Sequence, residues 1–166
     1  EIVLSNKESE FLASSSKGTV PVIVTPNKVI EQSLEIMHWA LAQSDPGSWL
    51  KMPATGYNWI SRNDGPFKTA LDHTKYSVRF PELDIRLERK KATKFLWSLN
   101  SQVANNKWMF GENCSLADMA ILPFVRQFAN IDNDWFYAQG WQSLHRWLTA
   151  FLNSDYFNSI MTKYDK

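Results

Sequence analysis

The chain has 166 residues, enough for one domain or a domain and a half, and its 44% hydrophobic and 21% charged residues are ordinary for a globular protein. A net charge of +1 argues against a nucleic acid partner, because proteins that bind phosphate backbones carry a basic surface. The single cysteine excludes an intramolecular disulfide framework and fits a reducing, cytoplasmic compartment, and no run of about eighteen apolar residues predicts a membrane span.

Residues 1–43 alternate β-branched runs with helical patterns. The expected elements are strands over residues 1–5, 20–24 and 28–30, a helical turn over 10–13 and an amphipathic helix over 31–43. Three short strands and one helix do not make a stable sheet domain alone, because such a sheet needs more strands or a second covering helix. Residues 1–43 are therefore expected to be the back half of a domain whose front half is absent.

A proline inside the second predicted strand is the most informative local feature. Pro21 cannot donate a ladder hydrogen bond, so it belongs to an edge, a bulge or a cis peptide, and each of these turns the backbone of Val20 outward. Gln32 and Ser33 follow in the first turn of the next helix, where backbone N–H groups lack partners and favour anions. An outward strand edge beside an anion-binding helix start indicates a peptide-recognition site.

Residues 44–48, Ser-Asp-Pro-Gly-Ser, carry the strongest linker signal in the chain, and residues 44–52 are predicted to be a linker. Beyond this linker the pattern is helical, with an interruption at Asn63-Asp-Gly-Pro66. The predicted helices cover residues 67–80, 83–103, 115–129 and 142–152.

The helix predicted over residues 83–103 is strongly amphipathic. Its basic side chains are interpreted as a solvated face rather than an RNA-binding stripe, because the charge elsewhere is balanced. The expected buried face consists of Leu87, Phe95, Leu96, Leu99 and Val103, and the basic face of Arg86, Arg89, Lys90, Lys91 and Lys94.

The helix over residues 115–129 opens with Ser115-Leu-Ala-Asp118, which has the form of a capping box, and its apolar first half predicts burial. The heavy aromatic load is interpreted as packing at helix–helix interfaces rather than stacking on nucleic acid. Core packing is likewise expected for Tyr57, Trp59 and Tyr76.

The residues that most often carry metal or thiol chemistry form no recognisable motif. Cys114 and the three histidines, His38, His73 and His145, share no metal-ligand spacing, so no metal site is predicted. Cys114 precedes a helix start, a place that lowers a thiol pKa, but it is interpreted as a structural thiol rather than a nucleophile.

Four segments together resemble a glutathione S-transferase of bacterial type, with some omega-like features. They are Ser5-Asn-Lys-Glu8, Gly18-Thr-Val-Pro21, Gln32-Ser33 and Phe110-Gly-Glu-Asn-Cys-Ser-Leu-Ala-Asp118. The family joins a thioredoxin-like domain to an all-helical domain. The fold implied by the resemblance is α+β and mostly α: a partial thioredoxin-like ββα half over residues 1–43, the linker 44–52, and an all-helical domain over 53–166.

The resemblance also implies a set of glutathione-binding residues. Val20, before the family's cis-proline at Pro21, pairs through its backbone with the cysteinyl part of glutathione. Ser33 binds the γ-glutamyl carboxylate at the helix start, with Gln32 beside it. Lys7 holds the glycyl carboxylate, although the proline that follows this lysine in omega-type members is absent here.

The family's catalytic Tyr, Ser or Cys lies in a segment upstream of Glu1, so the chain is expected to be N-terminally truncated, and its catalytic residue remains unknown. The intact parent is expected to use glutathione as co-substrate and to transfer its thiol to an electrophile or reduce a mixed disulfide. Its implied partners are a small hydrophobic or disulfide substrate and a second copy in a cytoplasmic homodimer, with no nucleic acid and no membrane. The alternatives are a non-enzymatic interaction module on the same fold and an inactive truncated fragment.

Overall fold

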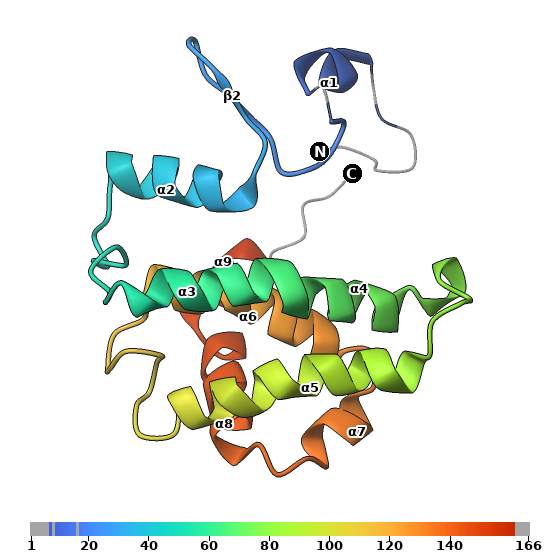
Figure 1. Ribbon diagram of the computed structural model, residues 1–166. Helices are drawn as coiled ribbons and strands as arrows, with labels where there is room; N and C mark the ends of the chain where they lie inside the picture. Colours follow the sequence, from blue (N-terminus) through green and yellow to red (C-terminus); the bar gives the residue numbers. More distant parts are fainter. Residues whose placement is uncertain (1–6, 8, 16, 162–166) are drawn as a thin grey trace. The chain divides into compact units, whose positions relative to one another are not determined.

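The computed structural model describes residues 7, 9–15 and 17–161 and divides into two compact units, Glu1–Leu50 and Lys51–Lys166 (Figure 1). The boundary between the units falls inside residues 44–52. The strand expected over residues 1–5 lies outside the described residues. None of the described helices combines the length and the hydropathy that a bilayer crossing requires.

The described residues of the first unit form two helices and a β-hairpin. Its elements are α1 (Ser9–Ser14), β1 (Ile23–Val24), β2 (Val29–Ile30) and α2 (Ser33–Gln43). The two strands pair antiparallel, with Ile23 opposite Ile30. The first of them is shorter than predicted because Pro21 has no N–H to donate to the ladder, so pairing starts only after it. The second helix begins at Ser33 rather than at residue 31.

The second unit is helical throughout its described residues, as the sequence predicted. Its elements are α3 (Thr55–Arg62), η1 (Asn63–Phe67), α4 (Lys68–Lys75), η2 (Ser77–Arg79), α5 (Ile85–Gln102), α6 (Leu116–Ala129), α7 (Asn133–Tyr137), α8 (Gln142–Leu152) and α9 (Asp155–Ile160).

The expected interruption around Pro66 is a π-helical turn rather than a break. The residues that flank η1, Arg62 and Lys68, both keep right-handed helical backbone angles, so α3, η1 and α4 follow one another without a loop. A π turn accommodates a proline because the widened ladder already leaves backbone groups unpaired.

α6 forms the centre of the helical core and packs against α3, α4 and α8. Its side chains Leu116, Ile121, Leu122 and Val125 are fully buried, as the all-round apolar pattern predicted. The four positions of α8 expected to pack inward are also buried: Leu144, Trp147, Leu148 and Phe151.

The predicted capping box at the start of α6 is present, and its Asp118 also accepts hydrogen bonds from residues outside the box. Asp118 is fully buried, and its Oδ2 accepts hydrogen bonds from the backbone N–H and the hydroxyl of Ser115, at 2.8 and 2.7 Å. Its Oδ1 accepts from the backbone N–H of Met109 at 2.9 Å and from Nε1 of Trp147 at 2.8 Å. Burial raises the pKa of Asp118 despite these donors. One carboxylate thus connects α6, α8 and the preceding loop.

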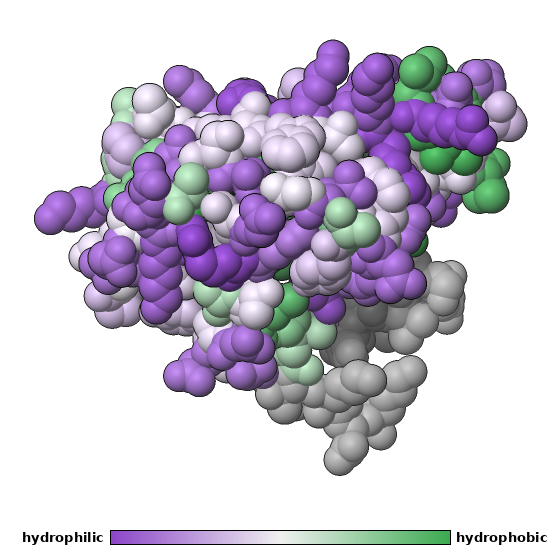
Figure 2. Space-filling view, turned by 90° about the horizontal axis from the view of Figure 1, so that it is seen from below, coloured by the Kyte–Doolittle hydropathy of each residue, from purple (hydrophilic) through white to green (hydrophobic). Residues whose placement is uncertain are grey.

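The prediction that Leu87 belongs to the buried face of α5 is wrong, because its side chain is 57% exposed. The buried face runs from Glu88 through Ala92 and Phe95 to Leu99, and Leu87 lies one residue off this helical period. Figure 2 shows a mainly hydrophilic face, with hydrophobic groups gathered over the turn between α4 and α5. The exposed apolar residues of that region are Val78, Ile85 and Leu87.

Aromatic side chains fill the helix interfaces, as expected from the composition. Trp141 is fully buried and makes edge contacts with the rings of Trp97, Trp135 and Phe136 at centroid distances of 5.4–5.9 Å. Core packing was the wrong expectation for Tyr57, whose side chain is 44% exposed on α3.

Candidate functional site

The open end of the β1–β2 hairpin brings two predicted binding segments together. The strand register pairs residue 23 with 30 and 24 with 29. Val20–Pro21 precedes the first of these pairs and Gln32–Ser33 follows it, so both segments leave the hairpin at its open end. Cα atoms of paired antiparallel strands lie about 5 Å apart, and both segments extend directly from such a pair. Figure 1 shows the hairpin rising from the first turn of α2. Four of the five predicted binding residues therefore lie at one end of the hairpin.

The Val20–Pro21 peptide bond is cis, one of the conformations that the sequence allowed. The Val20 side chain is 45% exposed, and Pro21 is also exposed. The strand ladder begins only at Ile23, so the backbone of Val20 is not part of the β1–β2 pairing. Its backbone groups are in a position to pair with an extended ligand.

The first turn of α2 has the features that favour an anion. Gln32 is the N-cap, with extended backbone angles of φ −101° and ψ 130°, and its side chain makes no capping hydrogen bond. Ser33 is the first helical residue, and both side chains are exposed. The N–H groups of this turn lack intrahelical acceptors and carry the positive end of the helix dipole.

The fifth predicted binding residue, Lys7, lies outside the helices and strands and has an exposed side chain. Its role in holding a carboxylate stays a prediction.

A hydrogen-bond network beside the hairpin was not predicted from the sequence. The hydroxyl of Ser15 donates to Glu31 Oε1 at 2.6 Å, and the backbone N–H of Lys17 donates to the same oxygen at 3.4 Å. The N–H of Gly18 donates to the Ser15 hydroxyl at 3.0 Å. The hydrogen bond from Ser15 lowers the pKa of Glu31. No periodic pattern couples residues this far apart in the chain, so the sequence offered no signal for this contact.

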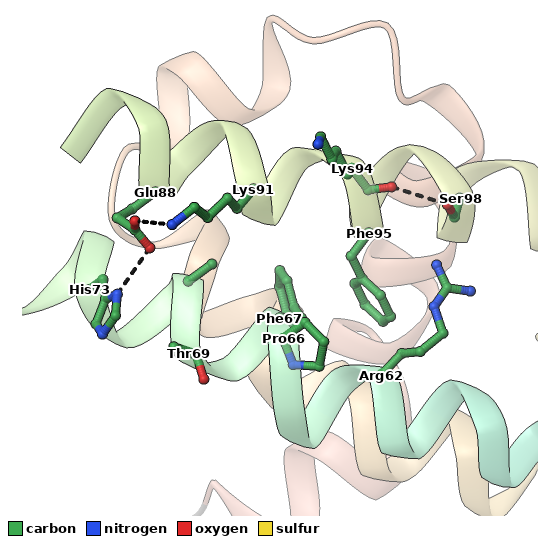
Figure 3. A pocket seen from close by; sticks show the side chains of 11 residues that line it. Arg62, Pro66, Phe67, Thr69, His73, Glu88, Lys91, Lys94, Phe95 and Ser98 are labelled. Carbon is green, nitrogen blue, oxygen red and sulfur yellow. Dashed lines mark hydrogen bonds and ion pairs between the residues drawn. The ribbon is translucent and has the colours of Figure 1, made fainter. Parts of the chain in front are cut away.

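The helical unit contains a cavity of about 510 Å³ between α3, η1 and α4 on one side and α5 on the other (Figure 3). Its floor is apolar, and the rings of Phe67 and Phe95 stack there with centroids 4.6 Å apart. The guanidinium of Arg62 lies 4.4 Å from the Trp59 ring centroid at one end. Tyr57, Trp59 and Tyr76 are not among the described residues that line it. A cavity of this size and polarity suits a small molecule or side chain with an apolar body.

A buried carboxylate, that of Glu88, lies at the other end of this cavity and was not predicted from the sequence. Glu88 is 4% exposed, and its two oxygens contact Lys91 Nζ and, at 2.9 Å, His73 Nδ1 (Figure 3). The hydrogen bond from Lys91, followed by that from His73, lowers the pKa of Glu88. Lys91 keeps the exposed side chain predicted for it, while its partner is buried.

Cys114 is buried, whereas reactive thiols are usually partly exposed. Among the residues that the structure describes, no three His, Cys, Asp or Glu side chains cluster in a way that would hold a metal ion.

Residues 80–155 match the family model for the glutathione S-transferase C-terminal domain. This part of the chain is therefore similar to that domain. The match spans α5, α6 and α8, which build the helical core, and includes the capping box at Asp118.

Solved glutathione transferases share the fold of this glutathione S-transferase-like chain. The enzyme from Pseudomonas putida, with one glutathione disulfide bound per subunit, is 20% identical with a TM-score of 0.76, over 92% of this chain and 73% of that one. The enzyme from Burkholderia graminis, with two glutathione molecules bound per subunit, is 18% identical with a TM-score of 0.76, over 92% and 70%. The expected fold, a partial thioredoxin-like unit followed by an all-helical domain, is confirmed.

A curated relative is elongation factor 1-gamma 3 from Oryza sativa subsp. japonica, which is 26% identical over 129 residues. The matched region covers 73% of this chain and 31% of the relative's length, so the chain spans about a third of that protein.

Proposed function

We propose that this chain is part of a glutathione transferase and that its first unit binds glutathione. The observation that carries the proposal is the exposed Val20, outside the strand ladder at the open end of a hairpin whose other arm leads into a helix start without a side-chain cap at Ser33. Glutathione, an extended tripeptide with a carboxylate at each end, matches both features: its backbone can pair with the strand end, and one of its carboxylates with the helix start. The solved relatives that hold glutathione or glutathione disulfide support this ligand.

Each predicted binding residue has a role in this proposal. The backbone of Val20 pairs with the cysteinyl part of the tripeptide, in the manner of an added strand. Ser33 and the N–H groups of the first turn of α2 hold the γ-glutamyl carboxylate, and the Gln32 amide adds a hydrogen bond. Lys7 pairs with the glycyl carboxylate.

The proposed reaction is a thiol transfer, either to an electrophile or in the reduction of a mixed disulfide. The chain contributes binding and orientation, while the sulfur of glutathione is the nucleophile. The residue that activates that sulfur decides the chemistry: a Cys in that role predicts disulfide reduction, and a Ser or Tyr predicts conjugation. The second substrate is a small hydrophobic molecule or a disulfide, and the protein is a cytoplasmic homodimer.

A second candidate function is a non-enzymatic interaction module on the same fold, because fold does not determine activity. The similarity to an elongation factor subunit favours this candidate. The two functions differ in one measurable property, since an enzyme of this family binds glutathione and an interaction module need not.

Isothermal titration calorimetry of the full chain with reduced glutathione tests the proposal. The wild type is expected to bind, and Ser33→Ala is expected to weaken binding by about 1–3 kcal/mol, because a hydrogen bond to a charged carboxylate is lost. Ser61→Ala, at an exposed serine of α3, is the matched control and leaves the dissociation constant unchanged.

If the wild type does not bind, the transferase proposal fails and the interaction module is favoured. If the wild type binds and Ser33→Ala binds equally well, the carboxylate is held elsewhere.

A further inference from the structure

The proposed glutathione site has two arms, Val20–Pro21 and Gln32–Ser33, and two separate connections link them. The hairpin joins them covalently, since one arm leads into β1 and the other leaves β2. The side chain of Glu31, the residue just before Gln32–Ser33, joins them a second time by reaching back to Ser15 and Lys17. The loop that Glu31 holds leads through Gly18 and Thr19 into Val20.

The contact is partly buried, and the serine hydroxyl both donates and accepts in it. Ser15 is 2% exposed, and its hydroxyl donates to Glu31 while accepting from the N–H of Gly18. Gly18 has a φ of +58°, a left-handed conformation that glycine adopts without strain and in which its N–H reaches the Ser15 hydroxyl. A hydrogen bond with little access to water is stronger than an exposed one.

The first unit has few other means of fixing this loop. Among its described apolar side chains, Ile30 is buried, whereas Leu12, Val20, Val24 and Val29 are each at least 45% exposed. With so few fully buried apolar side chains described in this unit, the polar contact to Glu31 is a substantial part of what fixes the segment before Val20.

We propose that Glu31 and Ser15 are positioning residues of the glutathione site. Their hydrogen bond holds Ser15 and Gly18, and with them the backbone of Val20, at a fixed separation from the first turn of α2. Neither side chain contacts the ligand. The inference rests on the proposed function, because it requires that both arms bind the same tripeptide.

Calorimetric titration of the full chain with reduced glutathione tests this role. Glu31→Ala and Ser15→Ala are each expected to raise the dissociation constant about fivefold to tenfold at unchanged stoichiometry, because the loss of one partly buried hydrogen bond loosens one arm. Glu31→Gln keeps an oxygen that accepts from Ser15, and its dissociation constant stays within about twofold of the wild type. Glu82→Ala, at an exposed glutamate of the helical unit, is the matched control and binds like the wild type.

A double variant shows whether Ser15 and Glu31 act through one shared hydrogen bond or affect binding independently. Ser15→Ala with Glu31→Ala is expected to bind no more weakly than the weaker single variant, because either change alone removes the same hydrogen bond. Additive losses contradict the proposal.

The number of glutathione molecules bound per chain distinguishes a positioning role from a loss of folded protein. A variant that merely unfolds part of the sample binds fewer glutathione molecules per chain with an unchanged dissociation constant, and that result overturns the positioning role. Wild-type-like binding by Glu31→Ala, while Ser33→Ala is weakened, overturns positioning and leaves the glutathione site standing. Absence of binding by the wild type overturns both.

Discussion

Different kinds of interaction stabilise the interior of each unit. In the helical unit, apolar side chains of α6 and α8 pack around one fully buried carboxylate, Asp118. In the first unit, α2 has no buried residue, and the loop before β1 is held by the hydrogen bonds of Ser15 and Glu31. Exposed backbone and a helix start without a side-chain cap are what a ligand needs, and a packed core excludes both. Under the proposed function, the helical unit supplies stability and the first unit supplies the exposed groups that bind the ligand.

The largest expected effect comes from removing the carboxylate at the centre of the helical core. Asp118→Ala leaves the N–H groups of Met109, Ser115 and Trp147 buried without an acceptor. Because each such donor costs about 1–3 kcal/mol, the free energy of unfolding is expected to fall by about 3–5 kcal/mol. Urea unfolding followed by circular dichroism measures the change.

Asp134→Ala, at an exposed aspartate in the first turn of α7, is the control for Asp118. A loss below about 1 kcal/mol in Asp118→Ala would show that the core does not depend on this carboxylate.

A smaller effect, confined to the first unit, is expected from Gly18→Ala. The φ of +58° costs a residue with a Cβ about 1–2 kcal/mol, and the new Cβ would lie 3.2 Å from Leu12 Cδ2. Hydrogen exchange is expected to accelerate for amides of the hairpin and to stay unchanged for α6, because the two units open separately. Gly65→Ala is the matched control, since no atom lies within 4 Å of its Cβ position. Equal acceleration in both units would show that they are one cooperative structure.

The smallest expected effect is a pH-dependent change in the free energy of unfolding, caused by Glu88 in the cavity of the helical unit. The pKa of Glu88 is lower in the folded protein than the ordinary 4.5, so the ionised carboxylate stabilises the fold above about pH 4.5. This contribution is lost as the pH falls through the folded-state pKa. The stability difference between wild type and Glu88→Gln, from urea unfolding at several pH values, should therefore shrink on acidification. A difference that grows instead would mean that Lys91 and His73 do not favour the charged form.

Helices and their buried faces were largely predictable, because they follow from local periodicity. The bounds of α8 and the capping box of α6 were predicted as found, since both depend on residues a few positions apart. Leu87 was assigned to the wrong face because the buried position one residue on, which keeps the helical period, is occupied by the charged Glu88. The interruption at Pro66 was recognised, but the local pattern does not distinguish a π-helical turn from a break in the helix.

Polar contacts between distant residues were not predictable. Ser15 with Glu31, and His73 with Glu88, join residues 16 and 15 positions apart across different elements, and neither pair has a sequence signature. The candidate site was predicted because its two parts each carry a local signal, a proline in a strand and a polar pair at a helix start.

The central claim is that glutathione binds at the open end of the hairpin. A titration of the ¹⁵N-labelled full chain with reduced glutathione, followed by two-dimensional NMR, tests it most directly. The largest shifts are expected at the amides of Val20, Ser33 and Leu34, with the amides of α6 unmoved. Shifts confined to the helical unit, or no shifts at saturating glutathione, would contradict the account.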